Sequence, residues 1–309
     1  MSLSSEEIAR YTRQVSVPAI GVEGQTKLKN ASVLCVGAGG IGSPAVLYLA
    51  AMGIGKIGVI DFDEVELSNL HRQIIFKPSD TGQKKVVLAA DTIKQINSTI
   101  NCVAIDDRLD IENAAEIIAP FDVVLDGSDN FATRYLINDT CIELKKPFVS
   151  ASVHQLSGPL TTISDTPPCY RCLFSKPPLP ELSPNCSEAG VLGVIPGILG
   201  TLAVNEVVKL ILGLPVLQGK LLQFDAINTS FNTVSYIQKE ECDSCVKHLS
   251  AKELIDDRTT ACHLIKELTY DEVLERKRLG QSIFMIDVRE GYERDIRQLP
   301  DSEHAPLAN

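Results

Sequence analysis

The sequence has no excess of basic residues: 29 lysines and arginines stand against 40 aspartates and glutamates, which gives a formal net charge of −11. A nucleic-acid backbone is bound by a basic surface, so this balance argues against a broad nucleic-acid interface. The opening residues, MSLSSEEIARYTRQ, also lack the apolar run of a signal peptide. We therefore expect a cytoplasmic protein that does not bind nucleic acid.

Long apolar runs are rare, and the one exception extends from Gly190 to Gly213 (GVLGVIPGILGTLAVNEVVKLILG). It is long enough to cross a membrane, but Glu206 and Lys209 interrupt it. Ionisable side chains are costly at the centre of a bilayer. We expect a core helix at a subunit interface and no membrane partner.

The cysteines number nine, an odd count that, without a signal peptide, favours a reducing compartment and metal or catalytic use. Four of them form two C-x-x-C pairs, namely Cys169, Cys172, Cys242 and Cys245. Four thiolates complete a tetrahedral Zn²⁺ shell that has no open position. The spacing predicts a structural zinc that clamps two distant segments, with disulfides as the alternative.

The order of apolar segments indicates the fold class. In the first half we expect strands at 32–36, 56–61, 102–106, 122–126 and 148–152, and helices at 43–52, 82–96 and 133–144. In the second half we expect strands at 158–164, 220–227 and 233–238. This pattern predicts an α/β fold: a Rossmann-like, mostly parallel sheet extended by antiparallel strands, with helices on both faces.

A glycine-rich loop follows the first of these strands. The segment GAGGIG contains Gly37, Gly39, Gly40 and Gly42, and Asp61 ends the next strand. Glycines in this position allow the backbone to approach phosphates, and the helix that follows offers free N–H groups. The usual interpretation is NAD or FAD binding, with the acidic residue on a ribose hydroxyl.

The residues after Asp61 favour a different chemistry. The run DFDEVELSNLHRQ ends beside Arg72, GQKK contains Lys85, and DGSDN contains Asp129 at a strand end. Cleavage of a nucleoside triphosphate needs cations near the leaving pyrophosphate, whereas hydride transfer does not. Asp129 suits Mg²⁺, which prefers oxygen ligands. Solvated surface lysines, a turn or helix cap at 126–130, and an NAD-dependent oxidoreductase are the alternatives.

Taken together, these motifs resemble the MoeB/ThiF family, the bacterial relatives of ubiquitin-activating enzymes, over about residues 5 to 247. The resemblance also rests on RYTRQ (10–14), CYRC, CDSC and the CSEAGV run that begins at Cys186. It implies that the C-terminal glycine carboxylate of a ubiquitin-like sulfur carrier, of the MoaD or ThiS type and ending in Gly-Gly, attacks the α-phosphate of ATP. The products are an acyl-adenylate and pyrophosphate.

The resemblance also implies roles for individual residues. Asn69, Arg72 and Lys85 are expected to neutralise the triphosphate, and Asp129 to position Mg²⁺. Arg13 resembles an arginine that family members donate across a dimer interface, which implies a homodimer. The expected ATP-binding set is Gly37, Gly39, Gly40, Gly42, Asp61, Asp63, Ser68, Asn69, Arg72, Gln73, Lys85, Asp129 and Asn130.

Cys186 matches a position where some family members carry a thiol that links to the carrier or takes part in sulfur transfer. An inert loop cysteine is the alternative, and a sulfurtransferase or cysteine desulfurase is a candidate further partner. The segment from Ser152 to Pro159 departs from the pattern of relatives near the expected carrier tail, which leaves the carrier open. A non-catalytic scaffold that binds a ubiquitin-like partner is a third hypothesis.

The C-terminal residues resemble the start of a rhodanese domain, through 268–274 and 284–290. No cysteine follows Cys262, so we expect no sulfurtransferase activity from this segment. The expected organisation is an adenylation domain at 1–246, a linker at 247–264 and an incomplete rhodanese-like segment at 265–309. An unrelated appendage is the alternative. The tail favours activation of the molybdopterin-synthase carrier, with thiamine or tRNA-thiolation carriers as alternatives.

Overall fold

The computed structural model describes residues 3–178, 190–254, 268–289, 291, 294 and 300–305. The chain divides into two compact units, Met1–Cys262 and His263–Asn309. The boundary falls within the segment expected to be a linker, and residues 247–254 belong to the first unit: the backbone N–H of Ala251 donates to Glu143 Oε2 at 3.3 Å.

An eight-stranded sheet forms the centre of the first unit, in the order β3-β2-β1-β4-β5-β6-β7-β8. Its strands are β1 (Ser32–Val36), β2 (Lys56–Ile60), β3 (Asn101–Ile105), β4 (Val123–Asp126), β5 (Phe148–Ala151), β6 (Ser157–Ile163), β7 (Lys220–Asp225) and β8 (Ser230–Ser235). Neighbours from β3 to β5 are parallel, and those from β5 to β8 are antiparallel. This confirms the expected mostly parallel sheet with an antiparallel extension.

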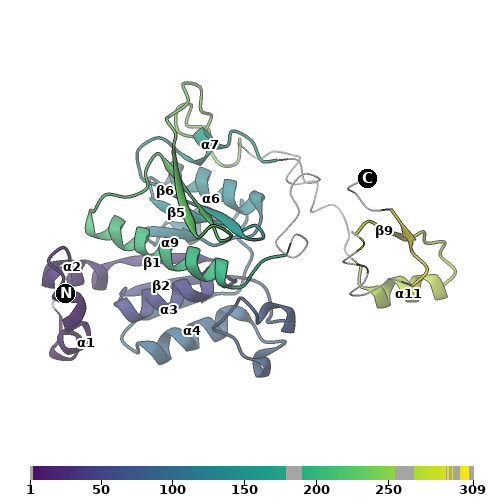
Figure 1. Ribbon diagram of the computed structural model, residues 1–309, viewed down its shortest axis with the longest axis horizontal. Coiled ribbons are helices and arrows are strands. Elements are labelled where there is room, and N and C mark those ends of the chain that lie inside the picture. The colour runs from purple at the N-terminus through teal and green to yellow at the C-terminus, as the bar shows by residue number, and fades with distance from the viewer. Residues whose placement is uncertain are drawn as a thin grey trace. The chain divides into compact units, whose positions relative to one another are not determined.

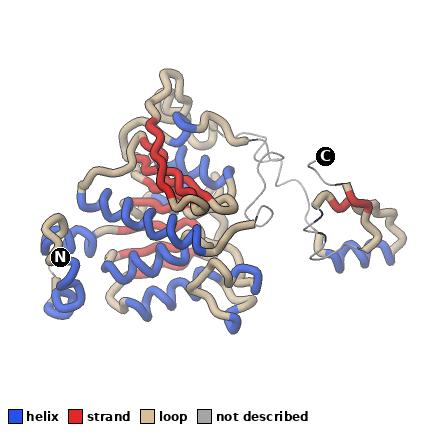
Figure 2. The backbone as a smooth tube through the Cα atoms, viewed as in Figure 1, coloured by secondary structure: helices blue, strands red, loops and turns tan. Residues whose placement is uncertain are grey.

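Helices cover both faces of this sheet (Figures 1 and 2). They are α1 (Ser5–Val15), α2 (Gly21–Asn30), α3 (Gly42–Met52), α4 (Lys85–Ile96), α5 (Ala114–Ile118), α6 (Phe131–Glu143), α7 (Tyr170–Leu173) and α9 (Val194–Leu212). Side chains alternate along a strand, so Val33 packs into a core with α3, α4 and α9, while Leu34 packs into a second core with α5 and α6.

Several element boundaries differ from the expected ones. Helix α4 begins at Lys85 instead of residue 82, because Gly82 has φ +82° and Lys84 still bridges to Glu64 in extended conformation. The N-terminal residues form two helices, and Gly21, the first residue of α2, has φ +58°. In both places a glycine in the left-handed region sets where the helix can start.

Strand β8 begins three residues earlier than expected. Asp225 accepts a hydrogen bond from the backbone N–H of Ile227 at 2.9 Å and one from Asn228 Nδ2 at 2.7 Å. This side chain closes a tight turn, so Ser230 already pairs with Asp225 in the hairpin. The expectation placed the strand by its apolar residues alone and missed the turn.

Helix α9 is the apolar segment noted in the sequence, and it is the one described helix that is long and apolar enough to cross a membrane. It packs against α3, β5 and β6 in the core. Glu206, which is 3% exposed, accepts hydrogen bonds from Thr162 Oγ1 and the Leu217 backbone N–H, both at 2.8 Å, and pairs with Lys209. The burial of a satisfied carboxylate confirms a core helix.

The second unit contains α11 (Tyr270–Arg278), β9 (Ile286–Asp287) and β10 (Glu303–His304). Thr269 and Glu272 form a reciprocal capping box at the start of α11. Strand β9 has two residues, which pair in parallel with β10. Asp287 is buried and forms an ion pair with Arg289 at 2.8 Å.

The polar contacts of Glu206 predict a stability effect. Replacing Glu206 with Ala leaves the Thr162 hydroxyl and the Leu217 N–H without their acceptor, so we expect the free energy of unfolding to fall by about 3 kcal/mol. Urea unfolding followed by circular dichroism measures this change. Thr201→Ala is the control on the same helix, since Thr201 is exposed and bonds only within α9. Equal stability of the two variants would contradict the prediction.

Candidate functional site

The loop after β1 requires glycine at two positions. Gly37 has φ +92°, and a Cβ there would lie 3.1 Å from the carbonyl oxygen of Gly127. A Cβ on Gly42 would lie 2.0 Å from the carbonyl oxygen of Gly37, closer than any real contact. The loop can therefore fold back onto the start of α3 only because both side chains are absent.

This loop lies where the strand order reverses, since β1 has β2 on one side and β4 on the other. The backbone N–H of Ala38 donates to Asp61 Oδ2 at 2.8 Å, which ties the loop to the end of β2. Gly37 lies against Gly127, which ties it to the end of β4. In open α/β sheets ligands bind in the crevice outside such strand ends.

Asp61 is held rigidly at this point. Its second oxygen, Oδ1, accepts the backbone N–H of Asp63 at 2.9 Å. Burial raises the pKa of Asp61, although nearby Lys85 and the two backbone N–H groups act in the opposite direction. Each carboxylate oxygen keeps a free lone pair that a ribose hydroxyl can donate to.

Arg72 and Gln73 lie beside the glycine loop. A Cβ placed on Gly40 would be 3.5 Å from Arg72 Cγ, and one on Gly39 would be 3.8 Å from Gln73 Nε2. Gln73 is 4% exposed, and its Oε1 has no hydrogen-bond partner among the described residues. A buried amide oxygen without a partner is costly, so the site has an unfilled polar position next to the loop.

The short helix η1 (Leu67–Asn69) orients Arg72. Arg72 Nη1 donates to the carbonyl oxygen of Ser68 at 3.1 Å, and Asn69 is buried and accepts the backbone N–H of Glu66 at 3.3 Å. The ring of His71 lies 2.8 Å from Arg72 Nη1. Burial and the charge of Arg72 lower the pKa of His71.

The two adjacent lysines have different surroundings. Lys85 is 4% exposed and its Nζ lies 2.8 Å from Asp63 Oδ2. Lys84 is more exposed and lies 3.7 Å from Glu64 and 3.5 Å from Asp106. Burial of Lys85 beside Asp61 and Asp63 argues against a solvated surface lysine at this position.

The loop after β4 carries Asp129. Asn130 caps α6 by accepting the backbone N–H of Thr133 at 2.8 Å, so the expectation of a helix cap also holds. Asp129 is exposed, and its carboxylate lies 3.5 Å from Asn130 Nδ2. A solvated carboxylate at a strand end is free to bind a hydrated cation.

Sequence reasoning missed the buried group that holds this loop. Asp126 is fully buried and accepts hydrogen bonds from the Ser128 hydroxyl at 2.6 Å and the Ser150 hydroxyl at 2.7 Å. Arg134 Nε lies 3.4 Å from Asp126 Oδ2. An arginine in the first turn of a helix that follows a strand-end aspartate was the available signal.

Two expected site residues are not brought to this position. Arg13 lies exposed on α1, where its side chain makes no hydrogen bond or ion pair with any described residue. Cys186 lies outside the described residues. The remaining expected residues from Gly37 to Asn130 gather at the ends of β1, β2 and β4.

The four cysteines of the C-x-x-C pairs form a separate buried cluster. The Sγ–Sγ distances are 4.0 Å for Cys169–Cys172, 3.6 Å for Cys169–Cys242 and 3.4 Å for Cys172–Cys245. Sulfurs bound tetrahedrally at 2.3 Å from zinc lie about 3.8 Å apart, so the cluster matches a zinc shell. All four are free thiols, which sets aside the disulfide alternative.

The thiols of the cluster lie within hydrogen-bonding distance of one another. The contact between Cys169 and Cys242 lowers the pKa of Cys242 and raises that of Cys169. Four thiols at these separations fit a cation that replaces their protons. The donor set therefore suits Zn²⁺.

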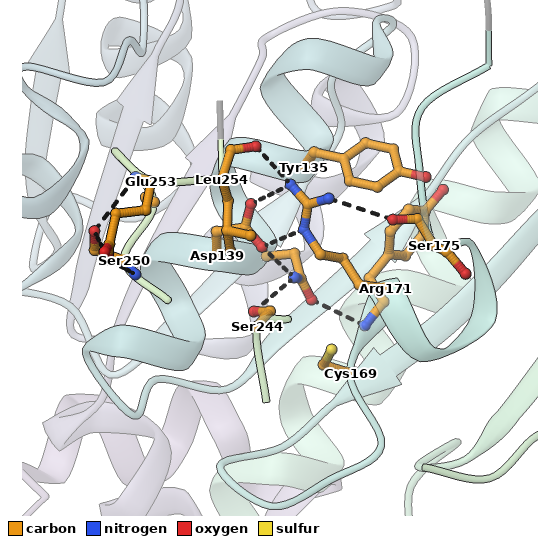
Figure 3. A network of polar contacts seen from close by, with 12 residues as sticks. Tyr135, Asp139, Cys169, Arg171, Ser175, Ser244, Ser250, Glu253 and Leu254 are labelled. Carbon is orange, nitrogen blue, oxygen red and sulfur yellow. Dashed lines mark hydrogen bonds and ion pairs between the residues drawn. The ribbon is translucent and has the colours of Figure 1, made fainter. Parts of the chain in front are cut away.

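A polar network connects the cysteine cluster to α6 (Figure 3). Arg171 binds Asp139 through two hydrogen bonds of 2.7 and 2.6 Å, and its Nη2 reaches the carbonyl oxygen of Leu254 at 3.4 Å. Asn138 accepts the Tyr170 backbone N–H at 2.9 Å and donates toward the Ser244 hydroxyl at 3.4 Å. Such neighbours fix the orientation of metal-binding side chains.

The ThiF family model matches residues 11–245. The chain is 44% identical to adenylyltransferase and sulfurtransferase MOCS3 of Culex quinquefasciatus, over 99% of this chain and 73% of that protein. It is 43% identical to the sulfur carrier protein adenylyltransferase of Thermus thermophilus, over 83% of this chain and 97% of that protein.

Solved structures share the fold at lower identity. A crystal structure of E. coli MccB with ATP has a TM-score of 0.67 and 22% identity, covering 78% of this chain and 75% of that one. A complex of MccB with MccA-N7isoASN has a TM-score of 0.68 at 22% identity, covering 76% and 74%. The fold, the family model and the relatives agree, and the chain belongs to the ThiF family of adenylyltransferases.

Proposed function

We propose that this protein adenylates the C-terminal glycine carboxylate of a ubiquitin-like sulfur-carrier protein. A carboxylate oxygen of the carrier attacks the α-phosphorus of ATP, the bond from that phosphorus to the bridging oxygen breaks, and pyrophosphate leaves. The names of the relatives support the carrier as substrate. The observation that carries the proposal is the position of two cations at the strand ends: Arg72 lies beside the glycine loop, and Lys85 lies beside Asp61 and Asp63.

The residues around the loop can be assigned to parts of ATP. The glycine loop and the start of α3 present backbone N–H groups to the phosphates. Asp61 receives the ribose hydroxyls, and the Gln73 amide lies beside Gly39. Asp63, Ser68, Asn69 and Asn130 complete the polar rim.

Charge neutralisation is the main catalytic task. Negative charge builds on the leaving pyrophosphate, and fixed cations in a partly buried site stabilise it without rearrangement. Arg72 is held by the Ser68 carbonyl, and Lys85 by Asp63. Asp129 is assigned to Mg²⁺, which would neutralise charge on the triphosphate.

The remaining residues act from other parts of the assembly. Arg13 is exposed on α1, as expected of a side chain that reaches the ATP of the partner in a homodimer. Cys186 is proposed as the thiol that receives the carrier or sulfur, with a sulfurtransferase or cysteine desulfurase as the sulfur source. The described cysteines are free thiols, which suits a reducing cytoplasm.

We propose the molybdopterin-synthase carrier as the substrate, with thiamine and tRNA-thiolation carriers as the alternatives. The expected rhodanese-like tail is the feature that favours this choice, and the match to proteins named adenylyltransferase and sulfurtransferase extends over it. If the protein were an NAD-dependent oxidoreductase, the positions of Arg72 and Lys85 would have no explanation. A scaffold without activity leaves the same residues unexplained.

ATP–pyrophosphate exchange with Mg²⁺ and a panel of carriers ending in Gly-Gly tests this function. We expect one carrier to stimulate exchange, and we expect Asp129→Ala to abolish it while the fold survives. Lys85→Met should lower the rate by about 100- to 1000-fold, the usual effect of removing a transition-state stabiliser.

Lys84→Met is the matched control, because Lys84 pairs outward with Glu64 and Asp106. Its exchange rate should stay within about threefold of the parent, since exposed ion pairs contribute little. Similar losses in the two lysine variants, or full activity of Asp129→Ala, would contradict the assignments. NAD binding without ATP binding would favour the oxidoreductase.

The cysteine cluster predicts about one Zn²⁺ per chain, measurable by elemental analysis. Cys245→Ser should lose the metal and lower the thermal midpoint, because a structural zinc contributes folding energy. Cys141→Ala is the control, since Cys141 is equally buried but lies outside the cluster. It should keep the metal. A metal-free protein that is fully folded with intact thiols would contradict the zinc site.

A further inference from the structure

Arg134 is a buried cation that the proposed reaction does not use. It lies in the first turn of α6 and is 5% exposed. A guanidinium is expensive to bury unless ionic and hydrogen-bonding partners surround it. The contacts of Arg134 therefore indicate which parts of the structure it holds in place.

The first group of partners is the loop that carries Asp129. Arg134 Nε lies 3.4 Å from Asp126 Oδ2, and Nη2 donates to the carbonyl oxygen of Ser128 at 3.0 Å. The Ser128 backbone N–H in turn donates to Asp126 Oδ1 at 3.0 Å. The guanidinium thus binds the loop at both ends of the segment that leads to Asp129.

The second partner belongs to the first C-x-x-C pair. Burial acts to lower the pKa of Arg134, but Asp126 and the nearby Tyr170 side chain raise it overall, so the side chain stays charged. The Tyr170 ring packs edge-on against Tyr135 with centroids 5.4 Å apart. One turn further along α6, Asn138 accepts a hydrogen bond from the Tyr170 backbone N–H.

We propose that Arg134 is a positioning residue for the adenylation: it fixes the 126–130 loop, and with it Asp129, against the cysteine cluster. The inference rests on the proposed Mg²⁺ role of Asp129. Arginine suits this task because its planar fork reaches a carboxylate and a carbonyl together, which a lysine cannot do. When lysine replaces Arg134, the loop that carries Asp129 is free to move, so Asp129 binds the cation less well.

The test is Arg134→Lys, which keeps the buried charge and removes the fork. Carrier-stimulated exchange is measured against Mg²⁺ concentration, and the half-saturating Mg²⁺ should rise about tenfold, the effect of one lost charged hydrogen bond. Hydrogen exchange at peptides covering 126–131 is measured in parallel and should become faster. Zinc content and circular dichroism should match the parent.

Arg171→Lys is the matched control. Arg171 is also a buried arginine paired with an aspartate, Asp139 on α6, but no described contact joins it to the 126–130 loop. The Arg171→Lys substitution should lower the thermal midpoint or the zinc retention of the protein. The half-saturating Mg²⁺ and the hydrogen exchange at 126–131 should be unchanged.

The outcomes separate the two proposals. Equal shifts in both variants, or unchanged exchange at 126–131 in Arg134→Lys, would overturn the positioning role. If the parent shows no carrier-stimulated reaction, the proposed function fails, while hydrogen exchange still tests the hold on the loop. Should Arg134→Lys not fold, Tyr170→Phe replaces it; a Mg²⁺ shift in the same direction supports the role, and an unchanged curve overturns it.

Discussion

The architecture depends on the close approach of backbone to backbone at the end of β1. Gly42 lies so near the Gly37 carbonyl that any side chain would collide, and Gly37 lies against Gly127. This approach brings the ends of β1, β2 and β4 within reach of one ligand. The cations and carboxylates of the site come from the segments after those strands. They lie close together because Gly37 and Gly42 have no side chains that would keep the backbones apart.

A second constraint connects the ligand edge of the sheet with the metal cluster. Helix α6 begins at the Asn130 cap beside Asp129 and later presents Asn138 and Asp139 to the cysteine cluster. A helix transmits position along its axis because its backbone hydrogen bonds fix each residue to the next turn. Helix α6 therefore contacts both sites.

Short sequence patterns predicted much of the structure. The strand–glycine loop–helix unit around Gly37 and the cysteine spacings are short-range signals, and both the sheet and the cluster agree with them. Arg134 was missed, although it lies in the first turn of the helix after the strand-end Asp126, because only the packing of that turn against the strand end brings the two side chains together. The start of β8 was missed because the Asp225 side chain, not the apolar pattern, ends the preceding strand.

The separation of the two cysteine pairs has a consequence for synthesis. Cys169 and Cys242 are 73 residues apart, so the first pair leaves the ribosome well before the second. At about 5–20 residues per second this interval lasts about 4–15 s. Strands β1 to β5 precede both pairs, so the nucleotide-binding half of the sheet is complete in the nascent chain while the first two thiols still await their partners.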